Sequence, residues 1–73
     1  MRPNKDARVE VIKPLNKSSV PVGATGTVVA LLGEPLMSFT VEWDDKSYGM
    51  SAFDTVSASR TLQIIDEEVK NDN

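Results

Sequence analysis

Cysteine and histidine are both missing from this chain of 73 residues. Without cysteine, neither disulfides nor thiolate metal sites can support a small core. Without histidine, the chain lacks the commonest general base, the commonest metal ligand and the usual partner of a nucleophilic serine. We therefore expect a protein that is not an enzyme and that uses no cofactor, metal or small-molecule substrate.

Long apolar runs are missing as well. The first ten residues lack the apolar stretch of a secretory signal, and no run approaches the ~20 residues that a membrane span needs. A chain this short buries only roughly 60% of its unfolded surface, which leaves room for one small core and no deep active-site cavity. We expect a soluble, cytoplasmic, monomeric protein that makes no membrane contact.

Basic residues are scarce outside the start of the chain. Residues 1–17 carry five basic and two acidic side chains, a balance of +3, whereas residues 18–73 carry three basic and nine acidic ones, a balance of −6. An acidic body repels phosphate backbones, so nucleic-acid binding is disfavoured unless the basic segment acts alone. A protein partner suits this polarity at least as well.

The clearest structural signal is a hairpin. From residue 37 to residue 44, apolar and polar side chains alternate with the two-residue period of a half-buried strand. The segment Thr25–Leu32 is rich in β-branched residues and predicts the partner strand. Gly33-Glu34-Pro35 supplies the turn between them. Gly23 and Gly26 can adopt positive φ, which would let the preceding loop turn sharply into the hairpin.

Three further strands are expected, at residues 8–13, 48–52 and 62–65, with a helical turn capped by Asp54 before the last. These elements predict an all-β fold, a small five-stranded barrel over residues 8–65. Residues 1–7 are expected to form a flexible basic arm and residues 66–73 a disordered acidic tail. The side chains expected to face the core are Val9, Val11, Val28, Ala30, Phe39, Val41, Trp43, Met50, Leu62 and Ile64.

Several residue types that can carry chemistry have a simpler structural interpretation. Trp43 shares a face with Phe39, so core packing is favoured over a role in recognition. The Asp44-Asp45 pair sits in a turn without enough neighbouring oxygen ligands for a cation. The spacing Gly23-x-x-Gly26 is too short for a phosphate-binding loop.

A candidate partner-binding surface follows from the apolar run Val28–Leu32. A sheet with one buried face buries only every second residue of a strand, so Val29 and Leu31 should face outward if Val28 and Ala30 face inward. By the same count Ile12 faces outward, and Leu36 lies at the hairpin turn. Ile12, Val29, Leu31 and Leu36 are candidates for an exposed apolar patch. The alternative is that a loop or the tail covers them.

Arg2, Lys5 and Arg8 are the second set of candidate binding residues. They can steer the chain toward an acidic protein surface or a phosphate. The alternative is a terminus that only adds solubility.

The pattern PVGATGTVV…FTVEWDD…LQII, within Val9–Ile65, resembles SH3-like barrels. Together with the short length, the acidity and the absence of cysteine and histidine, it is similar to small phage-encoded regulators that bind bacterial RNA polymerase. The resemblance implies a protein of the host bacterial cytoplasm that interferes sterically with σ-dependent initiation, or that acts in antitermination. Two alternatives stay open: a nucleic-acid or ribosome-associated SH3-like module, and a subunit that donates a sheet edge to a larger complex.

Overall fold

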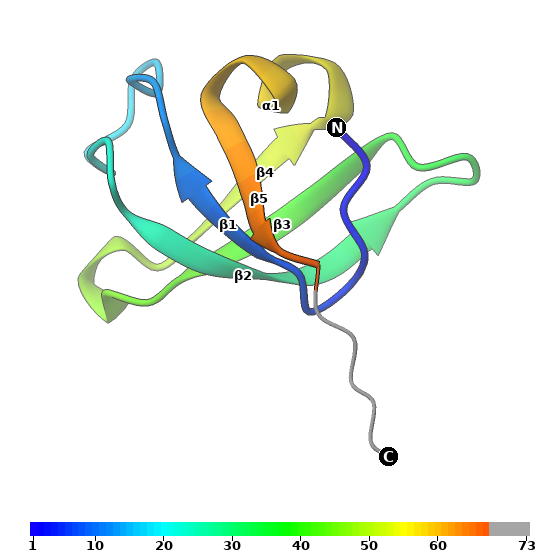
Figure 1. Ribbon diagram of the computed structural model, residues 1–73, viewed down its shortest axis with the longest axis horizontal. Coiled ribbons are helices and arrows are strands. Elements are labelled where there is room, and N and C mark those ends of the chain that lie inside the picture. The colour runs from blue at the N-terminus through cyan, green and yellow to red at the C-terminus, as the bar shows by residue number, and fades with distance from the viewer. Residues whose placement is uncertain (68–73) are drawn as a thin grey trace.

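The computed structural model describes residues 1–67, so residues 68–73 of the predicted disordered tail, residues 66–73, lie outside the described part, whereas Asp66 ends the last strand. Five strands form one antiparallel sheet in the order β4-β3-β2-β1-β5 (Figure 1). The predicted all-β class with five strands is confirmed. The elements in chain order are β1 (Arg8–Val11), β2 (Thr25–Leu32), β3 (Ser38–Trp43), the 3-10 helix η1 (Lys46–Tyr48), β4 (Met50–Asp54), α1 (Thr55–Thr61) and β5 (Leu62–Asp66).

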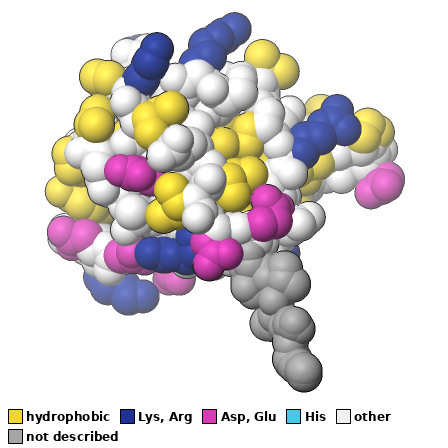
Figure 2. All heavy atoms as spheres, viewed as in Figure 1, with side chains coloured by type: hydrophobic (Ala, Val, Ile, Leu, Met, Phe, Trp, Pro, Cys, Tyr) yellow, Lys and Arg dark blue, Asp and Glu magenta, His cyan; other side chains and the backbone are white. Residues whose placement is uncertain are grey.

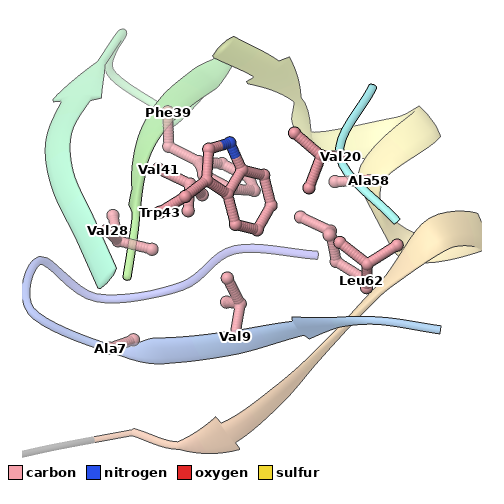
Figure 3. Close-up of a cluster of buried hydrophobic side chains, with 10 residues drawn as sticks. Ala7, Val9, Val20, Val28, Phe39, Val41, Trp43, Ala58 and Leu62 are labelled. Carbon is pink, nitrogen blue, oxygen red and sulfur yellow. The ribbon is translucent and has the colours of Figure 1, made fainter. Parts of the chain in front are cut away.

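The sheet curls around one hydrophobic core. β2 bends along its length, so that β1 and β5 cross β3 and β4 (Figure 1). Figure 3 shows the Trp43 ring at the centre of the buried side chains. Trp43 is 1% exposed, and its indole Nε1 donates to Ser51 Oγ at 2.9 Å, so its polar atom is satisfied. The interpretation of Trp43 as a core residue is confirmed. The buried apolar residues are Ala7, Val9, Val11, Val20, Val28, Phe39, Val41, Trp43, Ala58 and Leu62.

The helix α1 joins the two edge strands of the sheet. The Asp54 side chain accepts a hydrogen bond from the Ser57 N–H at 2.7 Å, which caps the helix as the sequence predicts. α1 buries Ala58 against the core and passes directly into β5. Within residues 1–67, no ladder pairs β4 with β5, so the sheet keeps two edges.

A β-bulge in β2 reverses the side-chain pattern expected for its second half. Val28 lies opposite Val41, but the next pair joins Ala30 to Thr40, which leaves Val29 as an extra residue. One extra residue moves every later side chain to the other face of the sheet. Ala30 is therefore exposed, and its prediction as a core residue is wrong.

The side chains of β4 that point toward the core are not the expected ones. The chain forms η1 before it enters β4, and Ser51 then lies opposite Val41 and Phe53 opposite Phe39. Residues directly opposite each other share a face, so Ser51 and Phe53 face inward. Met50 is 63% exposed, and its prediction as a core residue is wrong.

Residues 1–7, expected as a flexible arm, lie against the sheet in the structure. The Met1 ammonium group donates to the Thr55 carbonyl at 2.8 Å. Ala7 continues the β1–β2 pairing, because its carbonyl accepts from the Val28 N–H at 2.9 Å. Pro3 is buried, and Ala7 is fully buried in the core (Figure 3). This segment therefore covers part of the core.

Two glycines that were expected to play the same role play different ones. Gly23 has φ +97°, and no atom lies within 4 Å of the position that a Cβ would take, so backbone conformation alone requires glycine there. Gly26 has no positive φ and lies in β2 opposite Trp43. A Cβ at Gly26 would lie 2.6 Å from Val41 Cγ1 and 2.7 Å from the Glu42 carbonyl oxygen. Gly26 therefore does not use its freedom to adopt positive φ, and the close approach of the two strands explains the residue instead.

Candidate functional site

The β2–β3 hairpin projects beyond the rest of the sheet (Figure 1) and carries hydrophobic side chains on its surface (Figure 2). Leu32 and Met37 are each 67% exposed, and Leu31 is 45% exposed. Leu36 is half-buried at the turn. The Met37 N–H donates to the Leu32 carbonyl at 2.9 Å, which closes the hairpin. We call Leu31, Leu32, Leu36 and Met37 the apolar tip.

The structure brings together only part of the predicted apolar patch. Leu31 and Leu36 both belong to the apolar tip, and the bulged residue Val29 lies two positions before Leu31 and is half-buried. Ile12 is 39% exposed but lies just beyond the end of β1, where its N–H donates to the Thr61 carbonyl at 2.8 Å. That end of β1 is remote from the projecting hairpin (Figure 1). Ile12 is therefore not part of the apolar tip.

Leu32 and Met37 were missed as candidates. The alternation places Met37 on the face of Phe39, but the hairpin extends past the core at this point, so the side chain stays exposed. A signal was available in the strand lengths. β2 has 8 residues, whereas β1, which pairs with β2 on its other side, has 4 and pairs only with Thr25–Thr27. A long hairpin beside a short third strand must project at one end.

The guanidinium group of Arg8 is held by hydrogen bonds to other residues of the chain. Its Nη1 and Nη2 each donate to an Asp44 carboxylate oxygen at 2.7 Å, and Nη1 also donates to Thr27 Oγ1 at 2.9 Å. The Thr25 hydroxyl donates to the same carboxylate at 2.6 Å. The hydrogen bonds from Arg8, followed by the one from Thr25, hold the pKa of Asp44 well below its usual range, and Asp44 in turn raises the pKa of Arg8. Arg8 thus ties β1 to the end of β3.

The other two candidate cations lie at the surface. Arg2 is exposed. The Lys5 ammonium lies 3.9 Å from an Asp6 carboxylate oxygen, with side chains 63% and 61% exposed. An ion pair this exposed contributes little stability, so both Arg2 and Lys5 present their charge to solvent.

Asp45 has a local structural role beside the Arg8–Asp44 ion pair. Its carboxylate accepts from the Ser47 hydroxyl at 2.7 Å and from the Ser47 N–H at 3.0 Å, which caps η1. These hydrogen bonds lower the pKa of Asp45. Among residues 1–67, no group of three or more carboxylates is placed to hold a metal ion.

An open groove of about 280 Å³ lies between β4, α1 and the loop that joins β1 to β2. Its volume is at the lower limit for small-molecule pockets, and it is not enclosed. Phe53 lines the groove and is held by the core, because the centroid of its ring lies 5.8 Å from that of Phe39 and 6.1 Å from that of Trp43. The groove is lined by Leu15, Asn16, Ser18, Ser51, Ala52, Phe53, Ser57 and Thr61.

The fold and the surface together define a small all-β protein whose most prominent feature is an exposed apolar hairpin. Neither helix in the described part of the chain has the length and apolar character to cross a bilayer. No protein-family model, curated protein or solved structure matches the chain.

Proposed function

We propose that this protein is a non-enzymatic binding module that docks onto another protein through the apolar tip. The observation that carries the proposal is the exposure of Leu32 and Met37, 67% each, on the two faces of a projecting hairpin, with Leu31 on the same face as Met37. Large apolar side chains that are exposed together mark interaction sites in soluble proteins. Fully burying one such side chain is worth about 1.5–3 kcal/mol, which suits the anchor residues at the centre of an interface.

The partner in this proposal is bacterial RNA polymerase, and the protein is a phage-encoded transcription regulator. The support for this partner is the resemblance of the sequence to small phage regulators. A tip seated on the polymerase would occupy a surface that σ needs, so the effect on initiation is steric and requires no cofactor. The same occupancy on an elongating polymerase would give antitermination.

The geometry favours a protein partner over a phosphate backbone. The nucleic-acid or ribosome-associated alternative depends on the basic residues at the start of the chain. Of these residues, Arg8 is held by Asp44, which leaves only Arg2 and Lys5 with their charge presented to solvent. Binding to phosphates would need several cations that are free to displace counterions.

The test is co-elution with purified RNA polymerase core and holoenzyme on size exclusion, followed by titration of the labelled protein. The tip variant is Leu32→Ser with Met37→Ser. Its matched control is Val22→Ser with Ile65→Ser, because these two side chains are 53% and 46% exposed and lie outside the hairpin. We expect the tip variant to bind at least about tenfold more weakly and the control to bind as the parent does.

Release of σ from holoenzyme by the parent protein, and not by the tip variant, would support the steric mechanism. Equal binding by the two double variants would refute the role of the apolar tip. If the parent protein binds a labelled DNA duplex with a steep salt dependence and does not bind polymerase, the nucleic-acid alternative replaces this proposal.

A further inference from the structure

Within residues 1–67, no strand pairs with the outer edge of β4, so backbone groups on that edge are available for pairing. The Trp43 N–H donates to the Gly49 carbonyl at 3.0 Å, and the Thr55 N–H donates to the Met37 carbonyl at 3.1 Å. Hydrogen-bonded pairs alternate along an antiparallel ladder, so the odd-numbered residues of β4 bond to β3. Met50 and Ala52 consequently direct their N–H and C=O groups away from β3.

The open groove runs beside this edge. Ala52 is exposed and lines the groove, while its neighbours Ser51 and Phe53 contribute the inward-facing side chains. Leu15, on the loop between β1 and β2, supplies an apolar side chain on the opposite wall. A strand added at the usual spacing of about 4.8 Å from β4 would place alternate side chains in this groove.

Three basic residues adjoin lining residues of the groove, although the protein as a whole has a net charge of −3, and we call these three residues the basic rim. Lys17 lies between the lining residues Asn16 and Ser18, and Arg60 precedes the lining residue Thr61. Lys13 joins them, because its N–H donates to the Thr61 carbonyl at 3.4 Å. Figure 2 shows Lys and Arg side chains at the end of the molecule where α1 and this loop lie.

These three cations form no ion pair within residues 1–67. The nearby acid Asp54 is engaged as the helix cap and feels the charge of Arg60, which contributes to its lowered pKa. The rim thus keeps an excess of positive charge.

We propose that this groove takes an extended, acidic peptide segment of a partner protein, which adds to β4 as a further strand. Main-chain hydrogen bonds to Met50 and Ala52 would supply the pairing, in the manner of β-strand addition. Apolar side chains of the segment enter between Leu15 and Phe53, and its carboxylates meet the basic rim. This surface is separate from the apolar tip, and the inference does not rest on the proposed function.

The probe is a blocked, fluorescein-labelled peptide of alternating glutamate and valine, with a lysine–valine peptide as the charge-reversed control. We expect the glutamate peptide alone to bind and to slow amide hydrogen exchange at Met50 and Ala52. The amides of Ser51 and Phe53, which already bond to β3, should change little. This pattern distinguishes strand addition from side-chain docking.

Two pairs of variants test the components. Ala52→Pro removes the backbone N–H on the free edge of β4 without removing a hydrogen bond between β3 and β4, so peptide binding should be lost. Ala52→Thr keeps this N–H, so peptide binding should be kept. Lys17→Glu with Arg60→Glu should weaken peptide binding by at least about tenfold. Lys5→Glu with Lys46→Glu changes the net charge equally at sites away from the groove and should leave binding unchanged. The charge variants keep the test decisive even if Ala52→Pro fails to fold.

Several results would overturn the inference. Equal binding of the two peptides would remove the acidic specificity, and protection at β5 or the apolar tip would place the site elsewhere. Protection of Ala52 in the absence of peptide, with dimers in sedimentation, would make a second copy of the chain the occupant. Competition by a labelled single-stranded DNA, with loss of the Ala52 protection, would make the rim a phosphate site.

Discussion

Substitution of Gly26 by alanine tests the close approach of β2 and β3 beside Trp43. The added methyl group would meet Val41 Cγ1 at 2.6 Å, the Glu42 carbonyl oxygen at 2.7 Å and Trp43 Cε3 at 3.0 Å. Carbon atoms pack best at about 3.5–4.0 Å, so these neighbours must move by about 1 Å. One of them is backbone within the β2–β3 ladder, which limits relaxation.

Overpacking of this kind costs about 1–3 kcal/mol, and the lower entropy of alanine in the unfolded chain offsets about 0.5–1 kcal/mol. We expect Gly26→Ala to reduce the free energy of unfolding by about 1–2 kcal/mol, measured by urea denaturation at constant m-value. For a domain of this size the melting temperature should fall by roughly 4–8 °C per kcal/mol.

Gly23 provides the control, because only its positive φ requires glycine. Asparagine tolerates that conformation better than alanine does, so Gly23→Asn should be more stable than Gly23→Ala. At Gly26 the order should reverse, since asparagine adds atoms to an occupied space. An unchanged stability for Gly26→Ala, or the same order of variants at both sites, would refute this steric account.

Three further predictions concern the core, the ion pair and the helix cap. Trp43→Phe should cost about 2–4 kcal/mol in urea denaturation, because it leaves a void and removes the hydrogen bond to Ser51. Asp44→Asn should cost no more than about 1 kcal/mol at neutral pH, since the pair with Arg8 is half exposed. Because folding lowers the pKa of Asp44, its carboxylate stabilises the folded protein above the unfolded pKa of about 3.9, and this stabilisation is lost as the pH falls below that value. The free energy of unfolding of Asp44→Asn should therefore vary less with pH, between about 5 and 2, than that of the parent protein. Asp54→Ala should lower the melting temperature and increase amide exchange in α1, whereas Asp54→Asn, which can still cap, should change both less.

The apolar tip shows how far the candidate site was accessible from sequence. Leu31 is predicted to be exposed because an apolar strand must expose every second residue, and Leu36 because it lies at the hairpin turn. Both residues lie on the β2–β3 hairpin. The alternation assigned Ala30 and Leu31 to the wrong faces of the sheet. Alternation holds only while the strand register is unbroken, and the bulge at Val29 breaks the register. The remote position of Ile12 was not predictable, since the period of a strand carries no information about which strand ends lie together.

The basic residues show the same division. Arg2, Lys5 and Arg8 are close in sequence, and sequence alone treats them as one arm. In the folded chain Arg8 bonds to Asp44, 36 residues away, and loses its availability to a partner. Lys17 and Arg60, which are chain neighbours of groove-lining residues, come from a loop and a helix on different parts of the chain.

Local chemistry was decided by the sequence itself: the alternation through residues 37–44 that buries Trp43, the turn at Gly33, and the Asp54 cap of α1. These features depend on neighbours within a few positions, whose geometry the backbone fixes. Only the tertiary structure decided which face of β4 points inward, how residues 1–7 pack over the core and how closely the strands approach each other at Gly26. Each of these depends on which strand lies opposite, and strand pairing is set by the burial of the whole core.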